Sequence, residues 1–226
     1  YAVACAVPMD AEGVTLIYGR QSCDTRKLEE GDIDIGNYCF GAQETLSVLD
    51  NVFVPWERVF MCGELEFTSM LVERFAGYHR QSYGGCKPGI SDVLIGATAT
   101  IADYNGVRQA AHVRDKIAEM IHLAETIYGD GLASAYEGWK TKAGNYQSDI
   151  LLSNVTKHNV TRFPYEITRI AEDIAGGILV TTPSEKDFKH PVIGKYVDKY
   201  LRGVPDVPTE HRLRMLGLLH AMTFGT

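Results

Sequence analysis

The sequence predicts an α+β protein, with a β module over about residues 1–62 and a helical bundle over about residues 63–226. Two observations support this prediction. The first sixty residues contain short runs rich in β-branched and aromatic residues, whereas from Glu64 onward apolar residues recur at every third or fourth position. Strands that precede a run of long helices, rather than alternating with them, are typical of the α+β class.

Four strands are expected, at residues 1–7, 14–18, 33–40 and 45–54. A turn at residues 10–13 separates the first two. Pro55 follows the last one, and proline suits a strand end because it cannot donate a hydrogen bond to a neighbouring strand.

The helical part is expected to begin near Glu64, with a first helix that reaches about Tyr78. Pro88 is expected to open the next helix because proline favours the first helical turn. That helix is expected at 90–104. Further helices are expected at 113–139 with a break at 129–131, at 148–175 with an interruption at Phe163-Pro164, at 191–201 and at 209–224. Gly176-Gly177 is expected to end the helix before it.

Composition and charge narrow the function classes. The apolar fraction of 45% is typical of a folded domain, and the net charge of −7 argues against a nucleic-acid surface. No apolar run approaches the roughly 18 residues of a membrane span, and no signal peptide is evident. Five cysteines without a close pair favour a reducing, cytoplasmic compartment. Both ends of the sequence interrupt a structural pattern, so an internal piece of a longer protein is expected.

The segment 78–87 is the strongest candidate site because it combines His79 and Cys86, two side chains that bind metals and iron–sulfur clusters. In an unbroken helix the two residues would lie on one face but about 10 Å apart along the axis. Gly84-Gly85 is therefore expected to turn the chain back and bring them together. From the residues alone, a capping histidine, a helix end and a packing cysteine are the more common interpretation of such a segment.

A resemblance narrows this choice. The segment His79-Arg-Gln-Ser-Tyr-Gly-Gly-Cys-Lys87 is similar to the cluster-binding segment of the 4-hydroxybutyryl-CoA dehydratase family, in which a His and a Cys seven residues apart bind a 4Fe–4S cluster. Three further stretches resemble the family: Gly41-Ala-Gln-Glu-Thr45, Asp50-Asn-Val-Phe-Val-Pro-Trp-Glu-Arg58, and Glu172-Asp-Ile-Ala-Gly-Gly177 followed by Pro183-Ser-Glu-Lys-Asp187.

This resemblance implies an acyl-CoA dehydrogenase-like fold, shared with the flavin-dependent 4-hydroxyphenylacetate 3-monooxygenases. Residues 1–62 would then be part of the middle β-barrel domain, and residues 63–226 the carboxy-terminal helical bundle, truncated at its end. The family dehydrates 4-hydroxybutyryl-CoA to crotonyl-CoA and isomerises vinylacetyl-CoA. It uses FAD for a transient radical, because only the α-hydrogen is activated by the thioester, and a 4Fe–4S cluster as Lewis acid.

The resemblance also implies roles for individual residues. Cys86 would be a cluster ligand. His79 would also be a cluster ligand, with two alternatives: it serves as a ligand only, or it removes the α-proton as well. Tyr83 would donate a hydrogen bond and Lys87 would stabilise negative charge. Glu44 would orient the substrate or move a proton, although a solvated charge on a strand is the simpler interpretation. Gly176 and Gly177 would approach the flavin of a neighbouring subunit in a homotetramer, although a helix end explains them equally well.

The sequence departs from the family pattern at the two remaining cluster cysteines. The family's other two cluster cysteines form a CxxxC pair, and Cys5, Cys23, Cys39 and Cys62 lack that spacing. The sequence is thus expected to hold half of the cluster ligands and to be inactive alone. The alternatives are a flavin-dependent aromatic monooxygenase without a cluster, and a non-catalytic oligomerisation segment. An acyl-CoA is the expected small-molecule partner, with no nucleic acid and no membrane.

Overall fold

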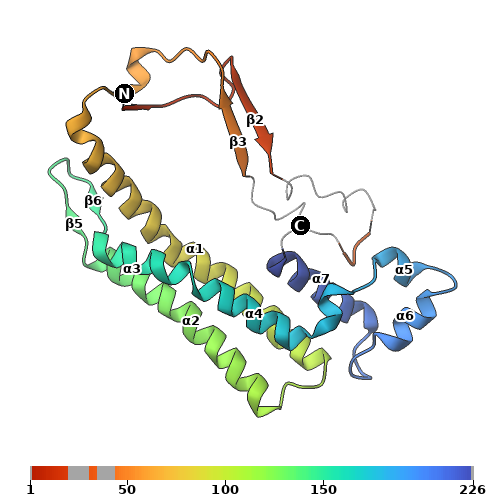
Figure 1. Ribbon diagram of the computed structural model, residues 1–226. Helices are drawn as coiled ribbons and strands as arrows, with labels where there is room; N and C mark the ends of the chain where they lie inside the picture. Colours follow the sequence, from red (N-terminus) through yellow and green to blue (C-terminus); the bar gives the residue numbers. More distant parts are fainter. Residues whose placement is uncertain (1, 20–30, 35–43, 225–226) are drawn as a thin grey trace.

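The computed structural model describes residues 2–19, 31–34 and 44–224. Strands come first along the chain and long helices follow, as the sequence predicts. Helices α1 to α4 form an elongated bundle, and α5, α6 and α7 gather at one end of it (Figure 1). Within the described ranges, no helix is long and apolar enough to cross a membrane.

The strands of the first sixty residues form small separate sheets. They are β1 (Val3–Cys5), β2 (Val14–Tyr18), β3 (Thr45–Leu49) and β4 (Val59–Cys62). β1 pairs antiparallel with β4, and β2 pairs antiparallel with β3. The sequence predicts the first three of these, two of them as longer strands, and it does not predict β4. Of the strand expected at 33–40, residues 35–40 lie outside the described residues and 33–34 are not in a strand.

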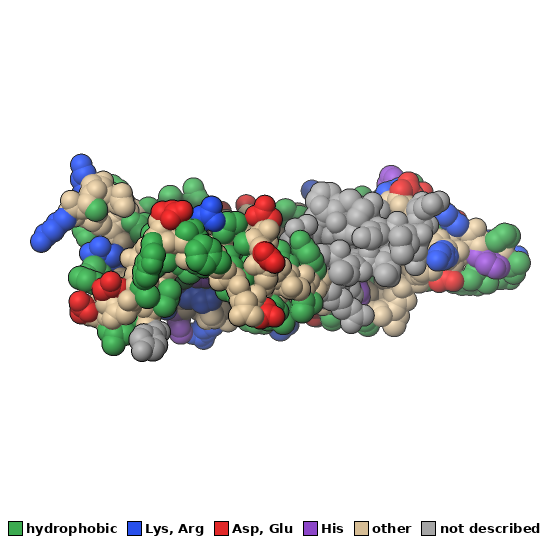
Figure 2. Space-filling model, turned by 90° about the horizontal axis from the view of Figure 1, so that it is seen from above, with side chains coloured by type: hydrophobic (Ala, Val, Ile, Leu, Met, Phe, Trp, Pro, Cys, Tyr) green, Lys and Arg blue, Asp and Glu red, His purple; other side chains and the backbone are tan. Residues whose placement is uncertain are grey.

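These strands do not enclose a core by themselves. Among the described residues before position 62, the buried hydrophobic side chains are Ile33 and Met61. Phe53, Trp56 and Phe60 are instead 83%, 77% and 73% exposed. Figure 2 views the molecule from the strand side and shows hydrophobic side chains over this face. The described strands form separate pairs and therefore do not close into a barrel. Two-stranded sheets of this kind bury too little surface to be stable alone.

Helix α1 (Thr68–Tyr104) runs without interruption through Gly84, Gly85 and Pro88. The expectation that the chain turns at the two glycines and that Pro88 opens a new helix is therefore wrong. An internal proline costs a helix about 3 kcal/mol, so packing has to hold this helix together. A Cβ atom on Gly84 would come within 2.4 Å of the Cα of Gly131 in the next helix. The lack of a side chain at Gly84 thus permits close contact between α1 and α2, and the chain does not turn there.

The remaining helices are α2 (Ala111–Tyr136), α3 (Ile150–Val160), α4 (Phe163–Ala175), α5 (Glu185–Lys189), α6 (Gly194–Tyr200) and α7 (Thr209–Thr223). The predicted interruption before Pro164 is confirmed, and α4 ends at Gly176, whose φ of 83° favours glycine. The break expected at 129–131 is wrong, because Gly131 provides the other half of the α1–α2 contact.

Several short elements have no counterpart in the sequence-based prediction. Helix α5 begins with a capping box between Ser184 and Asp187. A hairpin of β5 (Trp139–Lys140) and β6 (Tyr146–Gln147) joins α2 to α3. Each of these elements is too short to produce a hydrophobic period in the sequence.

The main core lies where α1, α2, α4 and α7 meet. Ile101 of α1, Met120 of α2 and Leu216 and Leu219 of α7 are completely buried in it. The core extends from the second half of α1, whereas the first half of α1 keeps many exposed apolar side chains. The segment 78–87 lies between these two regions.

A buried carboxylate connects the loop at 31–34 to this helical end. The carboxylate of Glu185 is 7% exposed and accepts hydrogen bonds from the backbone N–H groups of Asp32 (3.1 Å), Ile33 (2.7 Å) and Asp34 (3.1 Å). Burial acts to raise the pKa of Glu185, but the hydrogen bonds from Lys189 and from these three N–H groups outweigh it and lower the pKa to about 2. The loop is therefore held to α5 by an ionised carboxylate.

Candidate active site on helix α1

The candidate site occupies two turns of α1. His79 and Cys86 are exposed, and Tyr83 and Lys87 are half-buried. In a continuous helix, residues three, four and seven positions apart lie on the same side, so these four side chains share one side of α1. The local sequence thus presents four chemically active side chains along one stripe of the helix.

His79 lies between two aromatic rings on the same helix. The ring of Phe75, one turn earlier, stacks on it with centroids 6.0 Å apart, and the ring of Tyr83, one turn later, contacts it edge-on at 4.9 Å. The hydroxyl of Tyr83 lies 2.8 Å from Nε2 of His79, within hydrogen-bond distance. These contacts fix the imidazole, and Nε2 is the nitrogen that faces the phenol.

Two lysine ammonium groups lie near the ring of Tyr83. Nζ of Lys87 lies 5.8 Å from the centre of the Tyr83 ring, and Nζ of Lys157 from helix α3 lies 4.6 Å from it. Arg80 donates a short hydrogen bond to the side chain of Asn154, also on α3. The two helices therefore meet at the candidate site. Lys157 is not predictable as a site residue, because nothing in the sequence connects two residues so far apart along the chain.

Because α1 is unbroken, the distance between His79 and Cys86 limits the kind of metal group that the two residues could hold. His79 and Cys86 are nearly two full turns apart, so they point to the same side but remain separated by about 10 Å along the axis. A single ion with bonds of about 2 Å cannot reach both. Only a group of several atoms could bridge them. Within the described ranges, no three His, Cys, Asp or Glu side chains are grouped so that they could hold a metal ion.

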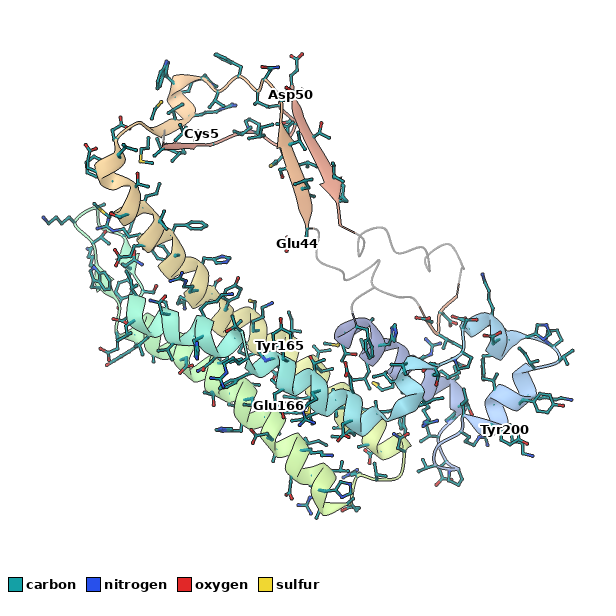
Figure 3. All side chains as sticks on the ribbon, viewed as in Figure 1. Cys5, Glu44, Asp50, Tyr165, Glu166 and Tyr200 are labelled. Carbon is teal, nitrogen blue, oxygen red and sulfur yellow. The ribbon has the colours of Figure 1, made fainter. Side chains whose placement is uncertain are left out.

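The structure does not bring Glu44 to this stripe. Glu44 is exposed and immediately precedes β3, on the strand side of the molecule (Figure 3). Its backbone carbonyl accepts a hydrogen bond from Gly19, and its side chain forms no hydrogen bond or ion pair with any residue that the structure describes.

Gly176 and Gly177 belong to a different part of the surface. They follow α4 and line a shallow hollow of about 430 Å³ together with Arg169, Asp173 and Phe224. A Cβ atom on either glycine would meet nothing within 4 Å. The space above these two glycines is open, and no residue of the segment 78–87 lines the hollow.

Comparison with known proteins gives consistent matches over the whole chain. Residues 1–61 match the family described as 4-hydroxyphenylacetate 3-hydroxylase N terminal, and residues 68–226 match the corresponding C-terminal family. The chain is 58% identical over its full length to the 4-hydroxybutyryl-CoA dehydratase/vinylacetyl-CoA-Δ-isomerase of Clostridium aminobutyricum and covers 48% of that protein.

Two solved structures illustrate the range of relatives. An oxygen-tolerant archaeal 4-hydroxybutyryl-CoA dehydratase from N. maritimus matches 99% of the chain with 62% identity and a TM-score of 0.94, and the match covers 45% of that structure. The oxygenase component of 4-hydroxyphenylacetate 3-monooxygenase, complexed with FAD, matches with 25% identity and a TM-score of 0.85 over 99% of the chain and 46% of that structure. The chain thus spans about half the length of the relatives it matches.

Proposed function

Since the chain belongs to the 4-hydroxyphenylacetate 3-hydroxylase family, we propose that it is part of a 4-hydroxybutyryl-CoA dehydratase that also isomerises vinylacetyl-CoA. The observation that carries this choice is the difference in similarity within the family. The chain is 58% and 62% identical to two dehydratases but 25% identical to the monooxygenase component. An active site that serves the same reaction is the simplest reason for this difference.

Within the shared fold, residues 1–62 would form part of a middle β domain and residues 63–226 most of a carboxy-terminal helical bundle, as in acyl-CoA dehydrogenase-like proteins. The exposed Phe53, Trp56 and Phe60 support this arrangement, because a β domain completed by further strands would cover them. The exposed apolar side chains on the first half of α1, such as Phe75 at 68%, would be covered in the same way.

His79 and Cys86 would hold a 4Fe–4S cluster as two of its ligands. Their chemistry fits, because an exposed thiol and an imidazole are established ligand types for such clusters, and their separation requires a group of several atoms. The described residues do not complete the ligand set, and a CxxxC pair of the family's kind, a spacing that the other four cysteines of this sequence lack, would supply two further ligands. When bound, the cluster would act as a Lewis acid on the departing hydroxyl and FAD would accept and return one electron.

The residues of the chain would then handle protons and charge. An imidazole nitrogen of His79 would accept the α-proton, the one hydrogen that the thioester makes acidic, and the hydroxyl of Tyr83, 2.8 Å from Nε2, would hold the ring in position. Lys87 would stabilise the negative charge that develops on the thioester oxygen. Glu44 would orient the substrate from the strand side once the complete protein surrounds the site. Water would form from the γ-hydroxyl and a β-hydrogen, and return of the proton held by His79 to the γ-carbon would complete crotonyl-CoA.

Gly176 and Gly177 would admit the FAD of a neighbouring subunit in a homotetramer. The open space above both glycines supports this role, because backbone without side chains permits a cofactor to approach closely.

The test uses the full-length protein, purified without oxygen. We expect conversion of 4-hydroxybutyryl-CoA to crotonyl-CoA, together with bound FAD and about four iron and four acid-labile sulfide per subunit. Flavin without iron, together with hydroxylation of 4-hydroxyphenylacetate when reduced FAD and O₂ are supplied, would instead identify a monooxygenase and refute the proposal.

A further inference from the structure

We propose that Lys157 of helix α3 is a positioning residue of the active site, which holds the Tyr83 ring and strengthens the Tyr83 hydroxyl as a hydrogen-bond donor. This inference rests on the proposed function, since it assigns Lys157 a role at the His79–Tyr83 pair. The two residues lie on different helices and are brought together only by the packing of α1 against α3.

The geometry is that of a cation–π contact. Nζ of Lys157 lies 4.6 Å from the centre of the Tyr83 ring, inside the limit of about 6 Å for this interaction. Lys87 lies farther away, at 5.8 Å, and belongs to the same helix as the tyrosine. Lys157 is therefore the closer of the two cations.

Lys157 has no competing acidic partner in the part of the chain that the structure describes. Among the described residues, neither Lys157 nor Lys87 forms an ion pair with a carboxylate. An ammonium group that is half-buried and lacks a counter-charge favours an electron-rich ring face as its partner. It also leaves net positive charge available to a developing anion in the site.

Two contacts of helix α3, neither of which involves Lys157, fix the position of the helix that carries this residue. Asp149 caps the helix by accepting a hydrogen bond from Leu152 N–H at 2.7 Å. One turn before Lys157, Asn154 accepts the hydrogen bond from Arg80 of α1. The α1–α3 contact is thus maintained independently of the lysine. Replacing Lys157 should consequently alter the site without separating the helices.

A cation above a phenol ring draws electron density away from the phenol oxygen, so the hydroxyl becomes a stronger hydrogen-bond donor. The Tyr83 hydroxyl lies next to Nε2 of His79. Loss of the lysine charge should therefore weaken this hydrogen bond, or one to the substrate, and so affect the chemical step more than substrate binding.

The test compares variants of the full-length enzyme. We expect Lys157→Met to lower kcat about 10-fold and to change KM little, and Lys157→Arg to restore kcat to within about 3-fold, because a guanidinium also binds over an aromatic ring. Lys157→Gln is a second neutral variant in case Met alters folding. The matched control is Lys195→Met, which removes an ammonium 5.0 Å from the ring of Tyr196, outside the site, and should leave kcat unchanged.

A double-mutant cycle with Tyr83→Phe tests whether Lys157 acts through the hydroxyl. If it does, Lys157→Met should lower kcat by less than about 2-fold once the hydroxyl is absent. Independent effects that multiply, or no rescue by Lys157→Arg, would overturn the role of Lys157. A wild-type enzyme that does not dehydrate 4-hydroxybutyryl-CoA would instead refute the proposed function, and the role of Lys157 with it.

Discussion

Gly84 of α1 and Gly131 of α2 are in direct backbone contact. A Cβ atom on Gly84 would lie 2.4 Å from the Cα of Gly131, and a Cβ atom on Gly131 would lie 2.6 Å from the Cα of Gly84. No side chain fits between the two helices at this point. The contact fixes the level at which α2 crosses α1, two residues before Cys86, and so contributes to the position of the candidate site.

We therefore expect Gly131→Ala to destabilise the protein by about 1–3 kcal/mol, because the added methyl group would meet backbone rather than a movable side chain. The control is Gly129→Ala on the same helix, where a Cβ would meet nothing within 4 Å. It should stabilise by roughly 0.5–1 kcal/mol, because alanine is the better helix former. Urea unfolding of the full-length protein measures both, and equal stability of the two variants would contradict the backbone contact.

Replacing Glu185 by Gln should destabilise the protein at pH 7 by about 1–3 kcal/mol. Both carboxylate oxygens accept hydrogen bonds, Oε2 from Ile33 and Asp34 and Oε1 from Asp32 and Lys189. An amide of either orientation would turn its NH₂ group toward these donors.

The effect of Glu185→Gln should depend on pH. The folded-state pKa of Glu185 is about 2, below its ordinary value of 4.5, so its stabilisation is complete above about pH 4.5 and is lost as the pH falls toward 2. The difference in unfolding free energy between wild type and variant should shrink over this window. Glu166→Gln, which breaks an exposed pair with Arg169, is the control and should cost less than about 1 kcal/mol. A difference that stays constant down to pH 3 would refute this account.

His79→Ala and Cys86→Ser should each lower dehydration by at least about 100-fold and reduce the iron content, because each would remove a proposed cluster ligand. Cys62→Ser is the matched control, since Cys62 is also an exposed free thiol but lies on β4. Iron, sulfide and activity assays on the anaerobic full-length protein provide the measurement. Full activity and iron in Cys86→Ser would leave this cysteine structural.

Gly177→Ala should reduce the FAD retained per subunit by about 10-fold without lowering the unfolding midpoint, since the fold leaves open space at this position. Gly176→Ala is the contrasting variant. The φ of 83° at Gly176 strains any other residue, so this variant should lose about 1 kcal/mol of stability whether or not flavin binds. Normal flavin content in Gly177→Ala would assign the two glycines to the helix end alone.

Local signals in the sequence predict many elements well. The apolar period places α7 within one residue of its observed end, and Gly176 marks the end of α4 as expected. Pro164 correctly indicates the interruption between α3 and α4. Each of these features depends on neighbours within a few positions, so the sequence around them is sufficient.

The same local signals give the wrong result at Gly84, Gly85 and Pro88. Taken alone, two glycines and a proline indicate a turn and a new helix, and the continuous helix α1 contradicts this. The energy that overrides the local preference comes from Gly131 of α2 and from the buried second half of α1. These contacts join residues that are distant along the chain.

Strands that precede helices, and a candidate cluster of His79, Tyr83, Cys86 and Lys87, are predictable from the order of residues along the chain. The continuity of helix α1 through this cluster, the approach of Lys157 from α3, and the place of Glu44 on the strand side emerge from the folded chain alone. The difference lies in the distance along the chain over which each interaction acts. Helical periodicity places residues three to eight positions apart, whereas the approach of α1, α2 and α3 depends on close packing between side chains and backbone far apart in the sequence.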